Sequence, residues 1–266
     1  MLLTALVSTA LAVEPVATTY ASLAGWESGL QWAGQAGLKH TFYGDPDSTL
    51  FTDVYVRGDV LLQLTPDYLR GGGQLEVSPM AMLVFRFKYE TSTYFGNVKS
   101  VYGFDRATDG YGDAERDQRT NGPGHDTRIT GTAVLRAKVG PAIVATVFDR
   151  AWIRQDPGEG VVGDYWYEPE YQMLVALDDK ILQNTTVLLY EKTLELDAID
   201  NVLIGVMSTY RRAQTSEDVI YRAGPMAVLN THDGDRSLLL LVQPQFVSRT
   251  FSAARPFLAM RGTMKF

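Results

Sequence analysis

Long runs of alternating apolar and polar residues are the feature that most constrains the fold of this chain. In residues 75–90 the odd positions, from Leu75 to Tyr89, are all apolar or aromatic, whereas the even positions begin with Glu76 and end with Glu90. Because successive side chains of a β-strand point to opposite faces, this run predicts a strand with one continuously apolar face. Helical periodicity is hard to find after residue 30, so the sequence predicts an all-β protein.

Residues 53–64 and 236–250 show the same alternation, and in the first of these runs Val60 and Leu62 lie on the face opposite to Asp59. The runs last roughly 12–16 residues, whereas strands of soluble proteins average about 5–6. At about 3.3 Å per residue, the longest would reach roughly 50 Å. A tilted membrane-spanning strand needs only about 9–11 residues, so these strands are long enough to cross a bilayer and project beyond it.

The pattern predicts an antiparallel, up-and-down transmembrane β-barrel of about ten strands. Strands are expected near residues 30–43, 50–64, 74–95, 127–138, 142–154, 180–192, 201–213, 218–230, 236–250 and 255–266. Pro79, Pro225 and Pro244 fall inside them, where each removes a ladder donor, so β-bulges are expected there. Asp149 and Arg150 fall on opposite faces of one strand, so that one of the two would meet lipid.

The links between these strands are of two kinds. Short links are expected at residues 66–73, 139–141, 195–200 and 232–235. Two long polar loops are expected near residues 96–126 and 155–179. Short periplasmic turns and longer external loops are typical of outer-membrane barrels, and an even strand count puts both termini on the periplasmic side. Residues 164–178 are interpreted as part of an external loop over the mouth, because one more strand would make the count odd.

Composition excludes several classes of protein. The chain has 24 Lys and Arg against 31 Asp and Glu, a formal net charge of −7, which argues against a nucleic-acid surface. It has no cysteine, so a disulfide framework, a thiolate zinc site and a cysteine nucleophile are excluded. No run of about 18 apolar residues follows the N-terminus, which excludes a transmembrane helix. No cofactor is predicted.

The N-terminus is interpreted as a signal peptide over residues 1–12. The segment is apolar, about as long as a signal h-region, and ends in the small-x-small pattern Ala10-Leu11-Ala12, although it lacks a basic n-region. A buried helix of the mature protein is the alternative. Residues 13–266 are then expected to form a single barrel domain.

The chain ends on an aromatic residue in register with an apolar face. Leu258, Met260, Met264 and Phe266 share one parity, with Gly262 between them. This ending resembles the C-terminal signature of Gram-negative outer-membrane β-barrel proteins. The resemblance implies an outer-membrane location, lipid contact, and recognition of the final strand by the barrel-assembly machinery.

A soluble, lipocalin-like ligand-binding barrel is the main structural alternative, because it shares the alternation and differs only in which face points outward. In a membrane barrel of about ten strands the interior is narrow and filled by side chains. The barrel is expected to be porin-like in its wall but without a wide diffusion pore, and a structural or interaction role is the first hypothesis. A narrow channel or a binding site for a small polar or anionic solute is the alternative.

A network of charges is predicted inside this barrel, because opposite charges fall on the polar faces of neighbouring strands and buried charges must be paired. Its members are Asp53, Arg57, Asp59, Arg86, Lys88 and Glu90. Further arginines on the same faces are Arg136, Arg211, Arg222, Arg249 and Arg261.

The long loops suggest three weaker hypotheses for a site at the rim. Oxygen ligands for Ca²⁺ are spaced along the first loop, at Asp105, Asp109, Asp113 and Glu115. His125 beside Asp126 is a candidate general base for an outer-rim hydrolase, although no G-x-S-x-G or H-E-x-x-H motif occurs. The aromatic residues of the segment 163–171 are expected to lie at the headgroup level or to stack on sugars.

Overall fold

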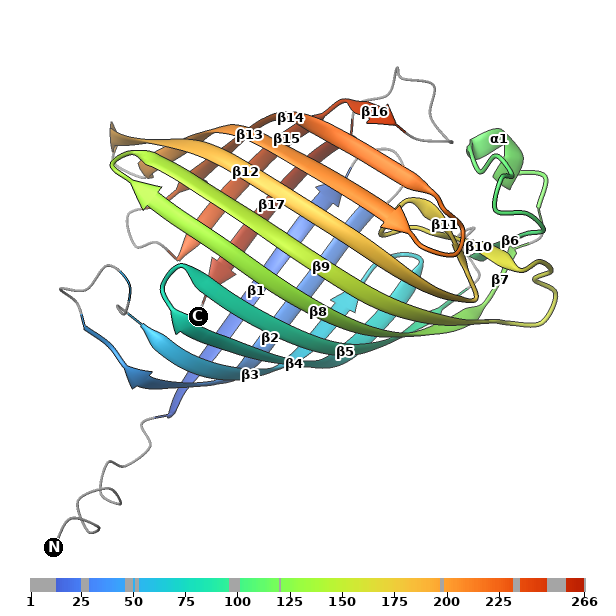
Figure 1. Ribbon diagram of the computed structural model, residues 1–266, viewed down its shortest axis with the longest axis horizontal. Helices are drawn as coiled ribbons and strands as arrows, with labels where there is room; N and C mark the ends of the chain where they lie inside the picture. Colours follow the sequence, from blue (N-terminus) through green and yellow to red (C-terminus); the bar gives the residue numbers. More distant parts are fainter. Residues whose placement is uncertain are drawn as a thin grey trace, which may run out of the picture.

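The chain folds into a closed antiparallel β-barrel (Figure 1). The structure is a computed structural model that describes residues 13–24, 29–45, 50, 53–95, 101–119, 121–196, 199–231, 235–247 and 257–265. The wall has 12 strands. They are β1 (Val13–Ala24), β2 (Gly29–Tyr43), β3 (Val54–Leu64), β4 (Tyr68–Met80), β5 (Leu83–Tyr94), β8 (Gly124–Val139), β9 (Ala142–Pro157), β12 (Asp178–Leu196), β13 (Ile199–Ala213), β14 (Val219–Asn230), β15 (Arg236–Gln243) with its continuation β16 (Gln245–Val247), and β17 (Phe257–Lys265).

The barrel closes where β1 pairs with β17, from Thr18 opposite Lys265 to Ala24 opposite Ala259. Each strand is antiparallel to its neighbours around the ring, and the pairing of β13 with β14 completes the ring. Closure pairs the edge strands, which a wall surrounded by lipid requires because no water is there to satisfy unpaired backbone groups.

The expected count of about ten strands is wrong by two, for local reasons. Residues 13–24 form β1, which pairs with both β2 and β17. The single strand expected over residues 74–95 is two strands that turn at residues 81–82. The glycine-rich segment expected as a link belongs to β4, where a Cβ on Gly72 would lie 2.2 Å from the Tyr89 carbonyl oxygen, so glycine permits the close approach of β5.

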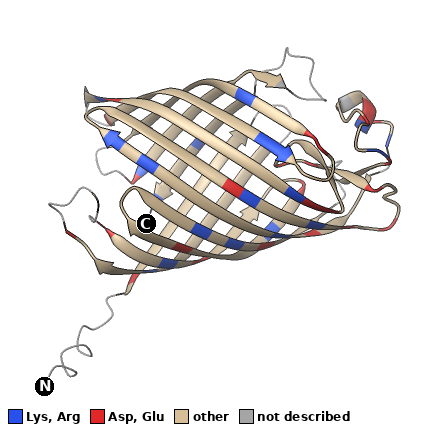
Figure 2. Cartoon of the chain, viewed as in Figure 1, with Lys and Arg blue, Asp and Glu red and all other residues tan. Residues whose placement is uncertain are grey.

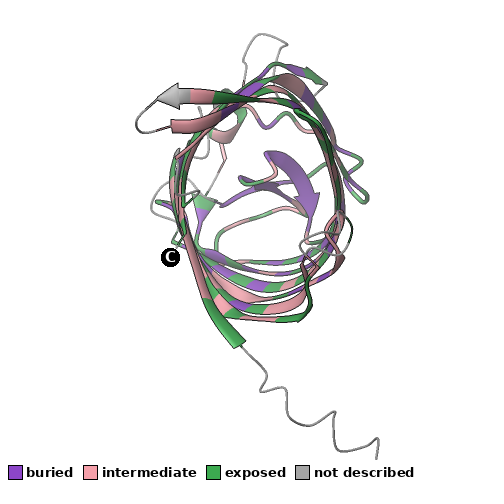
Figure 3. Ribbon diagram, turned by 90° about the vertical axis from the view of Figure 1, so that its left-hand side faces the viewer, coloured by how far each residue is buried: buried purple, intermediate pink, exposed green. Residues whose placement is uncertain are grey.

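The apolar faces of the strands point outward and the polar faces point inward. Val60 is 71% exposed and Phe87 54%, whereas Asp59 between β2 and β4 is 6% exposed. Figure 2 shows charged residues along the wall, and Figure 3 shows exposed and buried residues alternating along its strands. This orientation rules out the lipocalin-like alternative, in which the apolar face would line the interior.

The strand pairing shows which of the three prolines lie at register shifts and which of Asp149 and Arg150 points inward. Pro244 separates β15 from β16, where the pairing with β14 shifts register, and Pro79 lies in a register shift between β4 and β5. Pro225 stays in register opposite Val206, so no bulge forms there. On β9, Asp149 points inward, where its Oδ1 accepts a hydrogen bond from Thr132, and Arg150 points outward.

A second, smaller sheet lies at the end of the barrel opposite the termini, which we call the capped end. It has the order β11-β10-β6-β7 and arises from the two long links of the chain. The first link, between β5 and β8, contains β6 (Val101–Phe104), α1 (Asp113–Arg116) and β7 (Asn121–Gly122); the second, between β9 and β12, contains β10 (Tyr165–Glu168) and β11 (Met173–Ala176). Residues 164–177 thus lie outside the wall, in agreement with the interpretation of the segment 164–178 as a loop rather than a wall strand.

Candidate functional site inside the barrel

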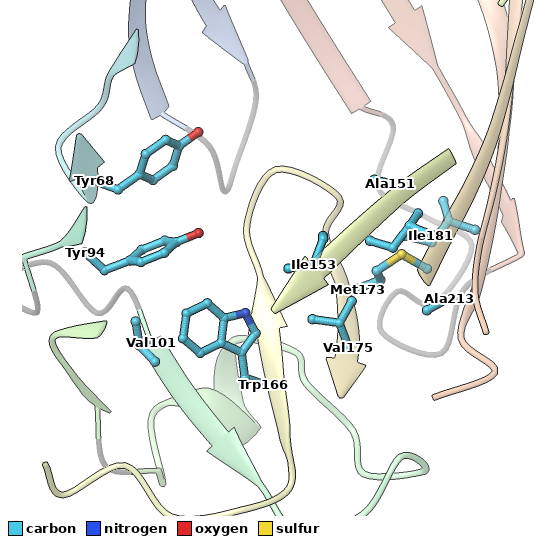
Figure 4. Packing of buried hydrophobic residues seen from close by; sticks show 11 residues of the cluster. Tyr68, Tyr94, Val101, Ala151, Ile153, Trp166, Met173, Val175, Ile181 and Ala213 are labelled. Carbon is cyan, nitrogen blue, oxygen red and sulfur yellow. The ribbon is translucent and has the colours of Figure 1, made fainter. Parts of the chain in front are cut away.

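The β10–β11 hairpin reaches into the barrel from the capped end, and its strands are held by apolar packing. Trp166 and Val175 are opposite each other in the hairpin and both are fully buried. The Trp166 ring meets Tyr94 of the wall edge to face, with the centroids 5.2 Å apart (Figure 4). The apolar cluster around them comprises Tyr68, Tyr94, Val101, Ala151, Ile153, Trp166, Met173, Val175, Ile181, Ala213 and Ile220.

The other face of the hairpin is covered by the first link. Tyr167 and Leu174 form a second buried cluster with Tyr102, Phe104 and Tyr111. The hairpin strands are therefore packed on both faces, against the wall on one side and against the β6–α1 segment on the other. These strands are called the hairpin base below.

The turn between β13 and β14 also holds the hairpin base, through hydrogen bonds to the β11 backbone. Asp218 Oδ2 accepts from the Leu174 amide at 3.1 Å, and the Ser216 hydroxyl donates to the Leu174 carbonyl oxygen at 2.6 Å. Asp179 Oδ2 accepts from the Ala176 amide at 3.1 Å. The buried carboxylates of Asp179 and Asp218 thus accept hydrogen bonds from backbone amides of β11.

The four residues between the hairpin strands, 169–172, are called the hairpin tip, and arginines of four wall strands contact them. Arg70 of β4 pairs with the Glu170 carboxylate, and Arg128 of β8 donates to its Oε2 at 2.7 Å. Arg211 of β13 donates from Nη1 to the Tyr171 carbonyl oxygen at 3.0 Å. Arg222 of β14 donates to the Gln172 side chain. The wall contacts to the tip are mainly charged and polar.

A compact group of charges lies where the tip leaves β10. Arg128 Nη2 is 2.6 Å from Asp126 Oδ2 and 2.7 Å from Glu168 Oε1, and both carboxylates are fully buried. With Arg70 and Glu170 the group holds two guanidinium ions and three carboxylates. Burying unbalanced charge is costly, so this arrangement favours a proton on one carboxylate.

The pKa values of the two hairpin glutamates move in opposite directions. Burial raises the pKa of Glu168, and Asp126 adds to the rise, against the opposing effect of Arg128. The Glu170 side chain is 42% exposed within the lumen; its partial desolvation would raise its pKa, but Arg70 and Arg128 outweigh this and the net pKa is well below the ordinary range. Of the two hairpin glutamates, Glu168 is therefore the one whose protonation is favoured.

The Tyr94 hydroxyl gives geometric support for that proton. It lies 2.8 Å from Asp126 Oδ2 and 3.2 Å from Glu168 Oε2, but it has one proton to donate. A protonated Glu168 can donate to the hydroxyl oxygen, which then donates to Asp126. In this arrangement the hydroxyl bridges Glu168 and Asp126 without a repulsive contact between the two carboxyl groups.

Two cavities border the hairpin tip within the lumen. The larger, about 300 Å³, has arginines Arg211, Arg222 and Arg261 on its lining and an apolar side that includes Leu239 and Phe257. The smaller, about 130 Å³, is lined by Arg70, Lys88, Glu90, Glu170 and glutamines. Glu170 borders both cavities, so the hairpin tip lies between two polar cavities inside the barrel.

The interior is more apolar than the sequence analysis predicted. On the side of the wall that runs from β9 through β12 to β17, inward side chains form a cluster around Leu189, Met226 and Leu241. Most charge pairs of the lumen lie on β2 to β5, whereas Arg211, Arg222 and Arg261 enter it from the apolar side. The lumen is therefore amphipathic across its diameter.

The predicted lumen charges form separate pairs rather than one site. Asp53 pairs with Lys39 at 2.5 Å and Arg57 with Asp59 at 2.7 Å. Lys88 and Glu90 are 3.7 Å apart. Arg86 pairs with Glu76, whose Oε1 also accepts a hydrogen bond from Tyr55 at 2.5 Å. Of these six residues, Lys88 and Glu90 line the smaller cavity beside the hairpin tip, and the further predicted arginines Arg211, Arg222 and Arg261 line the larger one.

Sequence reasoning missed the centre of the site. Glu168 and Glu170 lie in a segment interpreted as a surface loop, and the alternation of Glu168, Glu170 and Gln172 carries no sign that the loop folds inward. Arg70 lies in the segment expected as a link. Arg128 follows Asp126 at the spacing that puts both on one strand face, and this spacing was the one available signal.

The rim hypotheses for catalysis and metal binding are not supported. His125 and Asp126 are neighbours on β8 and point to opposite faces: His125 is exposed beside Thr93, and Asp126 is buried inside, so they form no catalytic pair. Asp105 and Asp109 both pair with Arg119, at 3.3 and 3.1 Å. Among the described residues, which include Glu115 but not the side chain of Asp113, no cluster of three or more potential metal ligands is found.

The C-terminal strand has the expected faces over its described part. Leu258 and Met260 point outward and are exposed, and Met264 has the same parity. Phe266 and the predicted signal peptide, residues 1–12, lie outside the described residues. No described helix is both long and apolar enough to span a membrane.

Known structures share the barrel fold at low sequence identity. The beta domain of the Bordetella autotransporter Brka has a TM-score of 0.51 and 11% identity, over 96% of this chain and 99% of that one. An outer membrane channel from Pseudomonas putida F1 has a TM-score of 0.41 and 9% identity, over 95% of both chains. OmpT of Vibrio cholerae has a TM-score of 0.40 and 7% identity, over 96% of this chain and 97% of that one.

The first of these likenesses confirms that the chain has the fold of Gram-negative outer-membrane β-barrels, the class that its C-terminal strand resembles. A fold of this class is in line with the expected outer-membrane location. No protein-family model matches the sequence, and no curated protein matches it.

Proposed function

We propose that this protein is an outer-membrane barrel that conducts small anions when the hairpin tip moves aside. In the proposed orientation the capped end is external and the termini are periplasmic, because the long links lie at the capped end. The observation that carries the proposal is that four wall arginines, Arg70, Arg128, Arg211 and Arg222, converge on the tip inside the lumen.

The conducted solute would be anionic because the positive and negative charges of the lumen belong to different parts of the protein. The arginines belong to the wall, whereas Glu170, the carboxylate that pairs with Arg70 and Arg128, belongs to the tip. Displacing the tip removes negative charge from the lumen and leaves the arginines in place. Guanidinium groups in a narrow, partly desolvated passage attract anions.

The contacts of the tip make this displacement feasible without unfolding. The hairpin base is held by two apolar clusters. In the tip, Tyr171 packs against the first of these clusters, but Glu170 and Gln172 are held by charged and polar contacts that water and ions can replace. Gln172 has a φ of 55°, in the left-handed region that is unfavourable for residues other than glycine. The strain at Gln172 is relieved when the tip changes conformation, which lowers the cost of opening.

Planar-bilayer recording of the native chain and a tip-shortened variant tests the proposal. In the variant, Asn-Gly replaces residues 169–172, because Glu168 and Met173 are paired and a two-residue turn can join paired positions of a hairpin. The hairpin base is unchanged. We expect rare openings in the native chain and sustained conductance in the variant.

A matched control replaces exposed acidic residues of the first link, with Asp117→Asn and Glu115→Gln, and is expected to behave like the native chain. If the tip-shortened variant folds, as judged by a heat-dependent shift on SDS gels, and still does not conduct, the proposal is wrong. The structural or interaction role would then be the better hypothesis.

A further inference from the structure

The outer wall carries an unusual group of cations near the capped end, on three adjacent strands. Arg150 of β9 is opposite Leu182 of β12, and Leu182 is opposite Arg212 of β13. Lys180 lies two residues from Leu182 on the same face and is opposite Trp152. We call Arg150, Lys180 and Arg212 the wall cations. At about 4.8 Å between strands, Arg150 and Arg212 start from backbone positions about 10 Å apart.

Protein carboxylates do not neutralise the wall cations. In the described part of the chain none of the three has an acidic side chain within ion-pair distance, and Arg150 instead stacks over the Trp152 ring at 5.0 Å. A further cation, Arg154, is not one of the wall cations and is opposite Asp178. The outward positions at this end of β1 to β4 are apolar, with Leu23, Leu30, Leu64 and Leu69 exposed.

Aromatic residues place the wall cations near the level of lipid headgroups. Trp152, Tyr210 and Tyr221 are exposed on the same part of the wall, and Tyr210 is opposite Tyr221. Tryptophan and tyrosine concentrate at the two interfaces of a membrane barrel. Arg150 lies deeper than Lys180, and its long side chain can extend toward the interface.

An open groove of about 600 Å³ runs along the wall beside Arg150. Phe85, Phe148 and Leu182 line it, and the small residues Gly131 and Ala133 leave room for it. A Cβ on Gly131 would meet no atom within 4 Å. The groove is apolar and adjoins the cations, which is the arrangement that one acyl chain and a phosphate headgroup would occupy together.

We propose that this face binds a membrane lipid that carries phosphate, with the phosphate on the wall cations and an acyl chain in the groove. Unpaired arginines and lysines recognise phosphate through charge-assisted hydrogen bonds. A charged residue facing lipid is otherwise destabilising, most strongly near the bilayer midplane. The bound phosphate offsets the cost of placing Arg150 on this surface.

Native mass spectrometry of the full-length protein in detergent tests the proposal, with diphosphoryl lipid A as the probe. The variant Arg150→Gln/Lys180→Gln/Arg212→Gln is expected to retain the lipid about tenfold more weakly than the native chain. The matched control, Lys192→Gln/Arg236→Gln, removes two exposed cations at the opposite end of the barrel and should retain it normally. Gly131→Leu fills the groove without touching the cations and should also weaken retention.

Two further probes separate a lipid from free phosphate. The same lipid without its phosphates should bind weakly, and inorganic pyrophosphate should not displace the phosphorylated lipid at equal concentration. Equal retention by the triple variant and the native chain would overturn the proposal, as would equal binding of the dephosphorylated lipid. Displacement by pyrophosphate, or unchanged retention by Gly131→Leu, would rule out the acyl-chain component.

Discussion

The base and the tip of the β10–β11 hairpin are adjacent in sequence but are held by different forces. The base buries Trp166 and Tyr167 in two apolar clusters, whereas the tip is held by arginines of the wall. Apolar burial is lost only when the surfaces separate, but an ion pair also responds to pH, salt and competing ions. The base should therefore determine stability, and the tip should determine whether the lumen is open.

The largest expected effect is on stability, from Trp166→Ala in the base. Removing a buried aromatic side chain costs about 3–5 kcal/mol, because apolar contacts are lost and a cavity remains. We expect a clear decrease in the thermal unfolding temperature. Val162→Ala, at a residue that is 71% exposed, is the control and should change it little. An unchanged unfolding temperature in Trp166→Ala would contradict the role given to the base.

Arg128→Met should affect both stability and conductance, because Arg128 contacts base and tip. It removes the cation shared by Asp126, Glu168 and Glu170. Leaving buried charges without their partner costs about 3–5 kcal/mol. We expect lower thermal stability together with more frequent openings in planar bilayers. A loss of stability with the native opening frequency would show that the charge group is purely structural.

Glu170→Gln should change opening with little change in stability. The substitution keeps the size of the side chain and removes the charge that Arg70 and Arg128 contact. A hydrogen bond to a charged group contributes about 1.5–3 kcal/mol, so the open fraction should rise by about tenfold or more. Single-channel recording measures the open fraction, with Glu115→Gln as the control. A fall in thermal stability as large as that of Trp166→Ala would contradict the distinction between base and tip.

Opening of the lumen should depend on pH and should be least frequent at intermediate pH. Because the pKa of Glu170 is lowered in the docked tip, its contribution is complete above the ordinary glutamate pKa of about 4.3 and is lost as pH falls through the docked value. Because the pKa of Glu168 is raised, ionisation of Glu168 weakens docking as pH rises through that value. Recording from acid to alkaline pH should give low opening between two arms, and Glu170→Gln should lose the acid arm. A flat profile would contradict the titration of the tip.

The smallest effect is expected at the surface pair around Arg119. Arg119→Ala removes contacts to Asp105 and Asp109, which are partly exposed. Exposed ion pairs contribute about 0–1 kcal/mol, so neither the unfolding temperature nor conductance should change measurably. A large effect on either quantity would indicate that the first link controls the hairpin.

The sequence predicts the wall of this barrel well and its contents poorly, for a physical reason. Strand alternation is local, so the outward face of Val60 and Leu62 and the inward face of Arg57 and Asp59 follow from neighbouring residues. The ends of the strands were harder to predict, because the glycines beside Arg70, which suggested a turn, belong to the wall strand β4.

The hairpin site depends on contacts between residues far apart in the chain. Glu170 meets Arg70 at a separation of 100 residues, and no local pattern encodes that contact. Asp218 meets Tyr111 at a separation of 107 residues. The sequence predicted inward arginines at 211 and 222 but gave no information about which segment would enter the barrel to meet them.

The reversal potential of the tip-shortened variant in a potassium chloride gradient tests the central claim most directly. With residues 169–172 replaced by Asn-Gly, the lumen keeps Arg70, Arg128, Arg211 and Arg222 and loses Glu170. We predict a reversal potential displaced toward that of chloride, and a smaller displacement when Arg211→Gln is added. A reversal potential displaced toward that of potassium would contradict the account.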